Sequence, residues 1–204
     1  MIWEHVVGFY RNPIQEWHRV DKHHQTILVS LVHIAIFALM PPVMAYLSSV
    51  YIGWDVGIGE PIYLTATSAL NMSLAMYCAL IMGVIALAYL TYWMSHTFGS
   101  NPTYAQALEL AAYTATPIFM ASFAALIPHV WFLMLVGLCA VAYSVYLLYI
   151  GVPILMHIPK EQGFIYASSI VTSGLVLLVS IIASSVILWS YGMGPVFEHL
   201  ASSE

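Results

Sequence analysis

Charged residues are scarce in this chain of 204 residues. Asp, Glu, Lys and Arg together make up 6% of it, whereas hydrophobic residues make up 62%. A soluble domain carries about a quarter charged residues. Because so few charges cannot cover a surface that faces water, we expect most of the chain to lie in lipid as a single membrane domain, with no part built as a soluble catalytic domain.

Paired cysteines and clustered basic residues are lacking as well. Cys78 and Cys139 lie in apolar stretches outside any C-x-x-C pattern, so neither a disulfide framework nor a thiolate zinc site is expected. The four Lys and Arg residues form no cluster that could neutralise a nucleic-acid backbone. No nucleophile elbow, Walker loop or dinucleotide fingerprint occurs either. We therefore expect no enzymatic activity, no cofactor and no nucleic-acid partner.

Five apolar runs are each long enough, at about 20 residues, to cross the hydrocarbon as a helix. They cover residues 26–51, 63–93, 104–127, 130–150 and 166–191. Only Ile127, Pro128 and His129 separate the third run from the fourth. Pro128 favours a tight hairpin there, because proline interrupts a helix. The predicted fold is an all-α integral membrane bundle of five transmembrane helices.

The basic residues predict how this bundle is oriented. With five spans, all four basic residues fall on one side of the membrane: Arg11, Arg19, Lys22 and Lys160. The other side receives four acidic residues and no basic ones: Asp55, Glu60, Glu198 and Glu204. Lys and Arg accumulate in cytoplasmic loops, so we expect the N-terminus inside and the C-terminus outside. The chain then divides into a cytoplasmic or interfacial segment (1–25), a five-span domain (26–192) and a short outer tail (193–204).

The first 25 residues carry a signal for the start of a helix. Asn12 followed by Pro13, with Gln15 three residues after Asn12, is typical of an N-cap, a first helical position and a capping partner. The alternative is an unstructured tail. We expect a short interfacial helix. Its apolar side chains Ile14 and Trp17 would enter the headgroup region, and its charged side chains Glu16 and Arg19 would stay in water.

Several residues in the first three spans are costly in lipid. Pro41, Pro42 and Pro117 each remove a backbone donor and predict helix kinks. Polar or ionisable side chains also fall in these spans, namely His33, Asn71, Glu109, Tyr113 and Thr116. Two interpretations stay open. The residues could line a polar cavity that conducts a proton or cation, or they could satisfy one another and the backbone in a kinked, closed bundle.

Histidine is abundant, with nine residues. His23, His24 and His157 fall on the cytoplasmic side of the predicted topology and are the weak candidates for a metal site there. No H-x-x-x-H or H-E-x-x-H pair accompanies them. We therefore predict no bound metal.

Four short motifs follow one another through the second half of the chain. They read AYTATP at 112–117, LIP at 126–128, YLLYIG at 146–151 and IPKEQG at 158–163. In their order and spacing they resemble the core of the Yip family, the Ypt/Rab-interacting membrane proteins, and its bacterial branch in particular. The resemblance covers most of the chain after the N-terminal segment.

This resemblance implies a five-span fold with a cytoplasmic N-terminus, placed for the bacterial branch in the inner membrane. Eukaryotic relatives act in vesicle traffic by binding small GTPases and shaping membranes, a role that relies on a longer cytoplasmic N-terminal region. Only 25 residues precede the first run here, so we do not expect a GTPase partner.

Two functions follow as expectations. The first is a non-enzymatic, membrane-organising or partner-binding subunit of a larger membrane assembly, in contact with membrane lipids and with other membrane proteins or a second copy of the chain. The alternative is a small proton or cation transporter or channel that uses the polar groups of the first three spans.

Overall fold

The computed structural model describes residues 2–23, 25–54, 61–127 and 129–197. Its elements within these ranges are helices: α1 (Ile2–Arg11), α2 (Pro13–Lys22), α3 (Ile27–Ala38), α4 (Met40–Leu47), η1 (Ser48–Ile52), α5 (Ala66–Met94), η2 (Ser95–Phe98), α6 (Tyr104–Ala121), η3 (Ser122–Leu126), α7 (Val130–Leu155), α8 (Lys160–Leu188) and η4 (Trp189–Met193). Five helical stretches are long and apolar enough to cross a membrane: Ile27–Ile52, Ala66–Phe98, Tyr104–Leu126, Val130–Leu155 and Lys160–Gly192. The predicted five-span, all-α fold is thus confirmed.

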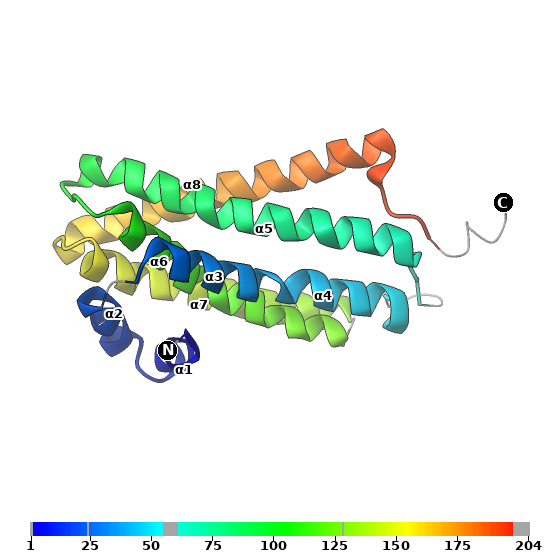
Figure 1. Ribbon diagram of the computed structural model, residues 1–204, viewed down its shortest axis with the longest axis horizontal. Helices are drawn as coiled ribbons and strands as arrows, with labels where there is room; N and C mark the ends of the chain where they lie inside the picture. Colours follow the sequence, from blue (N-terminus) through cyan, green and yellow to red (C-terminus); the bar gives the residue numbers. More distant parts are fainter. Residues whose placement is uncertain (1, 24, 55–60, 128, 198–204) are drawn as a thin grey trace.

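α6 lies among three other spans and contacts α3, α5 and α7. Of the most apolar 18-residue stretch in each span, 61% is buried in the α6 span but only 6% in the α8 span. α8 leans against α5 and α7 at the edge of the bundle (Figure 1). α6 is therefore the central helix of the bundle, and α8 lies at its periphery.

One end of the bundle, called the basic end below, gathers three segments distant in the chain. These are the α1–α2 hairpin, the connection between α5 and α6 (residues 95–103) and the connection between α7 and α8 (residues 156–159) (Figure 1). The His157 Nε2 atom lies 3.0 Å from Asp21 Oδ1, and Ser100 Oγ donates to the Met156 carbonyl over 2.6 Å. Hydrogen bonds and an ion pair thus join all three segments.

The name of this end comes from its charges. Arg11, Arg19 and Lys22 belong to the hairpin, and Lys160 begins α8. All four basic residues of the chain thus lie toward the same end, as the sequence predicts. The acidic residues expected on the opposite side lie outside the described residues, namely Asp55, Glu60, Glu198 and Glu204.

The N-terminal segment forms two helices, where the sequence predicts one. α2 starts as expected, with the Asn12 side chain accepting a hydrogen bond from the Gln15 amide over 3.4 Å. Trp17 and Glu16, however, are only 0% and 3% exposed, whereas Ile14 is half exposed. The prediction that Trp17 enters the headgroup region and that Glu16 stays in water is therefore wrong. Their environment is set by α7 and α1, which cover this face of α2.

Pro41 and Pro42 mark the break between the two helices of the first span. α3 ends at Ala38 and both prolines fall in the first turn of α4, where a missing N–H removes no intrahelical bond. α5 supports the chain on both sides of this break. Tyr77 donates to the Ala35 carbonyl over 3.1 Å, and Ser73 donates to the Pro42 carbonyl over 3.2 Å. A neighbouring span thus satisfies backbone groups in lipid.

Pro117 lies inside α6 and does not end it. It removes the N–H that would otherwise bond the Tyr113 carbonyl. Two threonine hydroxyls donate to other carbonyls of the same helix, Thr114 to Leu110 over 2.7 Å and Thr116 to Ala112 over 2.9 Å. These threonine hydroxyls supply extra hydrogen-bond donors to the backbone next to the position where Pro117 interrupts the helical hydrogen bonds.

Candidate functional site

A cluster of polar side chains lies inside the bundle toward the basic end. We call these residues the polar cluster: the half-buried Gln25 and the buried His33, Glu109, Tyr113 and Thr116. Glu109 and Tyr113 stand one turn apart on α6 and are 0% and 2% exposed. The Glu109 carboxylate accepts a hydrogen bond from the Gln25 backbone amide, and the Gln25 side chain donates to the Tyr113 hydroxyl over 2.8 Å. The segment between α2 and α3 is thereby fastened to α6 at two points.

His33 extends the polar cluster from α3. Its Nε2 atom lies 2.8 Å from Thr116 Oγ1, and the Thr116 proton is already donated to the Ala112 carbonyl. Nε2 must therefore be the donor in this pair. The ring stacks on Phe37 at 4.6 Å between centroids and meets Tyr113 edge-on at 4.9 Å. Among the described residues, His33 Nδ1 has no hydrogen-bond partner.

A second buried carboxylate belongs to the hairpin. Glu16 Oε1 accepts from His5 Nδ1 over 2.5 Å, and Glu16 Oε2 accepts from Arg19 Nη1 over 3.3 Å. The His5 ring also lies 5.9 Å from the Tyr113 ring. Glu16 approaches α1 so closely that a Cβ on Gly8 would lie 2.2 Å from Glu16 Oε2. A Cβ at position 8 would therefore displace this carboxylate from its present place.

Aromatic side chains of the hairpin cover the polar cluster. Trp17 is fully buried, and its Nε1 donates to the Leu147 carbonyl of α7 over 3.1 Å. Its ring fits beside Gly151, where a Cβ would lie 2.6 Å from Trp17 Cε2. Phe9 packs edge-on against Trp17 at 4.6 Å, and Tyr143 of α7 donates to the Phe9 carbonyl over 2.7 Å. The hairpin is therefore part of the core.

Little empty space remains beside the polar cluster. A cavity of about 10 Å³ lies between α1 and α6, lined in part by Phe9, Tyr113, Thr116 and Pro117. This volume is about enough for one water molecule. The arrangement can therefore hold the hairpin, α3 and α6 together, and the cavity is too small to serve as a passage across the bundle.

The structure brings together four of the five residues predicted for a polar path, namely His33, Glu109, Tyr113 and Thr116. The fifth, Asn71, is exposed near the start of α5, which begins at the opposite end of the bundle. Sequence reasoning missed Gln25, which joins Glu109 to Tyr113. Its position directly before the first apolar run is a signal that could have indicated a role at the boundary of the span.

The histidines considered for a metal site are separated. His157 pairs with Asp21, and His23 caps the C-terminus of α2. His24 lies outside the described residues. Within the part of the chain that the structure describes, no three His, Cys, Asp or Glu side chains gather in a way that could hold a metal ion.

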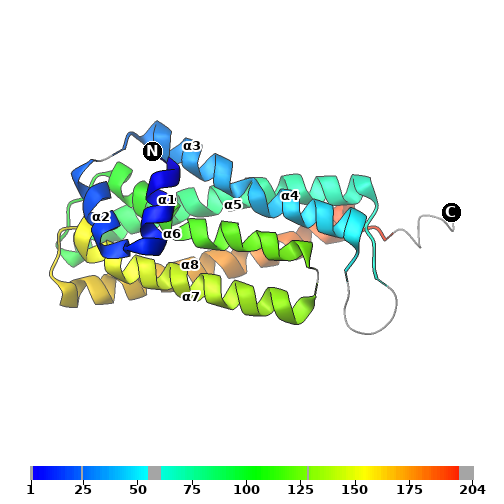
Figure 2. The same ribbon diagram turned by 90° about the horizontal axis from the view of Figure 1, so that it is seen from below.

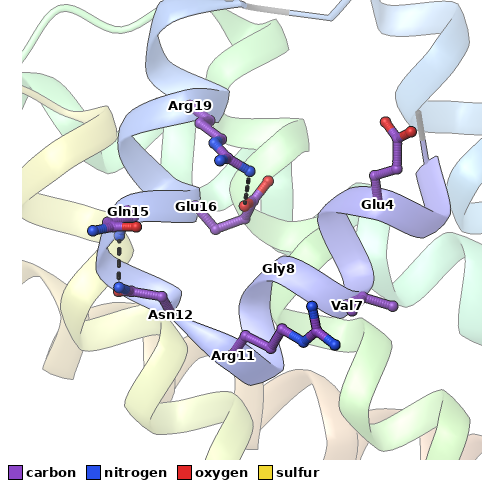
Figure 3. A pocket seen from close by; sticks show the side chains of 8 residues that line it. All are labelled: Glu4, Val7, Gly8, Arg11, Asn12, Gln15, Glu16 and Arg19. Atoms are coloured by element: carbon purple, nitrogen blue, oxygen red, sulfur yellow. Dashed lines mark hydrogen bonds and ion pairs between the residues drawn. The ribbon is translucent and has the colours of Figure 1, made fainter.

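A wide groove runs between α1 and α2 on the outer side of the hairpin (Figure 3). Its volume is about 550 Å³. Side chains of both helices line it, among them Glu4, Val7, Gly8, Arg11, Gln15 and Arg19. Unlike the polar cluster, this groove is open to the surroundings of the protein.

Known proteins resemble this chain along most of its length. A family model described as "Yip1 domain" matches residues 7–181. "Inner membrane protein YohC" of Escherichia coli K12 is 33% identical over 189 residues, which is 92% of this chain and 97% of that protein. The protein of the same name from Escherichia coli O6:H1 matches to the same extent. No solved structure matches the chain.

Proposed function

The chain belongs to the Yip1 family of multi-pass inner membrane proteins, and from this premise we propose that it acts without catalysis, as a membrane-organising or partner-binding subunit. The motifs between residues 112 and 163 lie inside the matched range, so the resemblance predicted from them is confirmed. The family by itself does not specify the role, which we infer from the polar cluster.

The observation that carries this proposal is the enclosure of the polar cluster. Glu109, His33 and Tyr113 lie in the bundle core, and each contacts a partner from another segment of the chain. The cavity described beside them has a volume of about 10 Å³. Polar groups used in this way fix the relative positions of helices, as expected of a closed bundle whose surfaces, rather than its interior, do the work.

We further propose that the basic end faces the cytoplasm. All four basic residues lie toward it, and Lys and Arg are enriched in cytoplasmic loops. Single cysteines placed at Lys160 and Ile127, in a background where Cys78 and Cys139 are replaced, test this orientation. An impermeant maleimide should label Lys160→Cys only in inverted vesicles and Ile127→Cys only in intact spheroplasts. The reverse pattern would exclude the proposal.

The subunit role is tested by the state of the chain taken directly from its membrane. Extraction into polymer nanodiscs followed by native mass spectrometry should retain either a second copy or a defined partner protein. A single chain without protein partners, obtained with several polymers and mild detergents, would contradict the role. Polymer extraction keeps the lipid around the protein, so detergent cannot displace a partner in this sample.

A conduit for protons or cations is the second candidate, and the buried ionisable groups of the first three spans are the observation that favours it. If it were correct, purified protein in liposomes would carry flux that Glu109→Gln abolishes. The matched control is Glu161→Gln, which changes an exposed carboxylate at the start of α8. The closed bundle predicts no flux above protein-free liposomes for any of the three chains.

A further inference from the structure

The position of the α1–α2 hairpin along the bundle is set by its contacts with α7. Tyr143 donates to the Phe9 carbonyl over 2.7 Å, and its ring stacks on the Tyr10 ring with 5.2 Å between centroids. Tyr143 lies at the middle of α7, which has 26 residues. At about 1.5 Å per residue, only about 20 Å of α7 remains between α1 and the end of the bundle opposite to the basic end.

Contacts with α6 place the hairpin at the same height. The Phe9 ring lies 5.0 Å from the Tyr113 ring, and the α6 span continues from Tyr113 to Leu126. This part of the span is also about 20 Å long. Figure 2 shows α1 lying across the long axis of the bundle over α6 and α7. The helix α1 is thus level with the middle of two spans and does not lie beyond their ends.

Charged side chains come with α1 to this height. Glu4 belongs to its first turn and Arg11 to its last turn, and both are exposed. Such groups are rare in hydrocarbon, where an ionised side chain is costly. Residues 130–142 of α7, on the far side of Tyr143, include none that is charged. The α6–α7 face therefore offers lipid an apolar surface about 20 Å tall, whereas the hydrocarbon is about 30 Å thick.

The opposite face of the protein is taller. α8 lies on the side of the bundle away from the hairpin (Figure 1). It exposes large apolar side chains from Phe164, at 61%, to Leu188, at 40%. These two residues are separated by about 36 Å of helix. The α8 face can therefore cross a bilayer of ordinary thickness.

Contacts between α7 and α8 relate the heights of the two faces. The two helices run antiparallel, and Tyr149 Oη lies 2.8 Å from Ser168 Oγ. Six residues farther along each helix, Tyr143 is level with Gly174, which is followed by the exposed Leu175. Leu175 lies near the middle of the apolar face of α8. The charges of α1 are thus at the height that is the middle of the membrane on the α8 side.

We propose that the α1–α2 hairpin lies in the leaflet at the basic end and thins the bilayer along the α6–α7 face, which thereby selects phospholipids with short acyl chains. A bilayer thins beside an apolar surface that is shorter than its hydrocarbon. Headgroups and water then reach Glu4 and Arg11, while α8 contacts a bilayer of ordinary thickness. The proposal rests on the membrane-organising role proposed above and gives it a physical form.

Spin labels at three positions test this difference between the faces. With Cys78 and Cys139 replaced, a single cysteine is placed at Val7 on α1, at Trp131 near the start of α7 or at Leu175 on α8, all of which are exposed. The labelled full-length chains are studied in dioleoyl phosphatidylcholine liposomes by power saturation of the spin resonance. Oxygen concentrates in hydrocarbon and a nickel chelate stays in water, so their relative effects report the surroundings of each label.

The labels at Val7 and Trp131 should respond more to the nickel chelate, and the label at Leu175 more to oxygen. This pattern requires a hydrocarbon about 20 Å thick between α1 and the start of α7. A Val7 label in hydrocarbon would show that the hairpin is buried in lipid of ordinary thickness. A Trp131 label in hydrocarbon would show that the protein tilts instead, and a Leu175 label in water would remove the common height. Each of these results would overturn the proposal.

The lipids that accompany the protein give a second test. The chain is reconstituted in equal amounts of dimyristoleoyl and dierucoyl phosphatidylcholine and extracted into polymer nanodiscs, and the lipids are quantified by mass spectrometry. Wild type should enrich the short-chain lipid about threefold, because each ångström of mismatch has only a small cost. Glu4→Leu combined with Arg11→Leu lets α1 lie in hydrocarbon and should abolish the enrichment.

The matched control combines Lys160→Leu with Glu161→Leu. It removes one charge of each sign from the start of α8, away from the hairpin face, and should enrich the short-chain lipid as wild type does. No enrichment in wild type, or equal enrichment in all three chains, would contradict the proposed thinning. Neither test depends on whether a partner or a second copy is bound, so failure of the thinning and failure of the subunit role are read separately.

Discussion

The basic end of the bundle and its opposite half are held together in different ways. At the basic end, side chains from the hairpin, α6, α7 and α8 form a continuous buried cluster that includes Trp17, Leu147 and Tyr166. In the opposite half, the same spans expose large apolar side chains, such as Trp131 at 76% and Val179 at 63%. One chain thus combines an end with a continuous buried core and a half in which large apolar side chains face outward, as Leu28 and Phe164 also do near the basic end.

The difference follows from the solvent on each side. Lipid tails are as apolar as Leu or Val, so helices inside the hydrocarbon gain little by covering one another. The basic end projects toward water, where apolar burial is favourable and unpaired polar groups can be satisfied. There the hairpin adds Phe9 and Trp17 to the core, and the Tyr166 hydroxyl donates to the Thr91 carbonyl between α8 and α5. The comparison predicts that equal substitutions should have unequal effects in the two regions.

The largest effect is expected from Trp17→Ala. Removing a fully buried indole from the basic end should lower the free energy of unfolding by about 3–5 kcal/mol. Trp131→Ala, at the opposite end, removes the same side chain from an exposed position and should change it by less than about 0.5 kcal/mol. SDS titration of the chain in dodecyl maltoside, followed by circular dichroism, measures both. Equal losses would show that the two regions respond alike to loss of a tryptophan and would contradict this prediction.

A smaller effect is expected from Gly151→Ala, at about 1–3 kcal/mol. The new Cβ would lie 2.6 Å from Trp17 Cε2 and 2.8 Å from Leu110 Cδ1. Gly137 lies on the same helix with nothing within 4 Å of an added Cβ, so Gly137→Ala should cost no stability. Both variants can be compared by the same titration. A loss in Gly137→Ala as large as that in Gly151→Ala would show that helix α7 is equally crowded along its length.

Glu109→Ala should loosen the segment between α2 and α3 without unfolding the bundle. The Gln25 amide loses its acceptor, and its hydrogen exchange should become about tenfold faster, since an unpaired buried donor costs about 1–3 kcal/mol. Glu161→Ala changes an exposed carboxylate and should leave exchange at Gln25 as in wild type. Hydrogen exchange with mass spectrometric detection of peptides spanning residue 25 checks this. Unchanged exchange in Glu109→Ala would contradict the role of Glu109 in holding this segment against α6.

The smallest effect is expected from Thr116→Val, which keeps the shape of the side chain but removes the acceptor for His33. The loss should be about 1 kcal/mol of unfolding free energy. Thr172 on α8 is exposed and donates only to the Ser168 carbonyl of its own helix, so Thr172→Val serves as the control and should be close to neutral. If the two variants were equally stable, the His33–Thr116 contact would contribute nothing to the basic end.

Local sequence signals accounted for most of the fold. The five runs and the proline break at Pro41 and Pro42 were predicted from apolar length and missing backbone donors, and the helix at Pro13 from its cap. Small residues on the last span are less informative. Ser180 and Ser184 are exposed, and their hydroxyls donate to carbonyls of their own helix. A small residue permits close approach of two helices, but it does not say whether a second helix is there.

The site was predictable in part. Ionisable groups in apolar runs pointed to His33 and Glu109, because such groups are rare in lipid without a reason. The sequence did not show that Asn71 would lie apart from them, nor that Gln25 would join them. Taken alone, the sequence of the Trp17 helix predicts that this side chain lies at the membrane surface. Its true neighbours, Leu147 and Gly151, are far away in the chain and lie on another helix.

By itself the sequence determined the solvent of this protein, the number of its spans and the side on which its cations gather, since each depends on composition within about 20 consecutive residues. Only the tertiary structure decided which polar groups meet. The Glu109 carboxylate and the Gln25 amide are 84 positions apart, and Trp17 and the Leu147 carbonyl 130 positions apart. A hydrogen bond acts over about 3 Å, so it forms only once the folding of the whole bundle has brought such residues together.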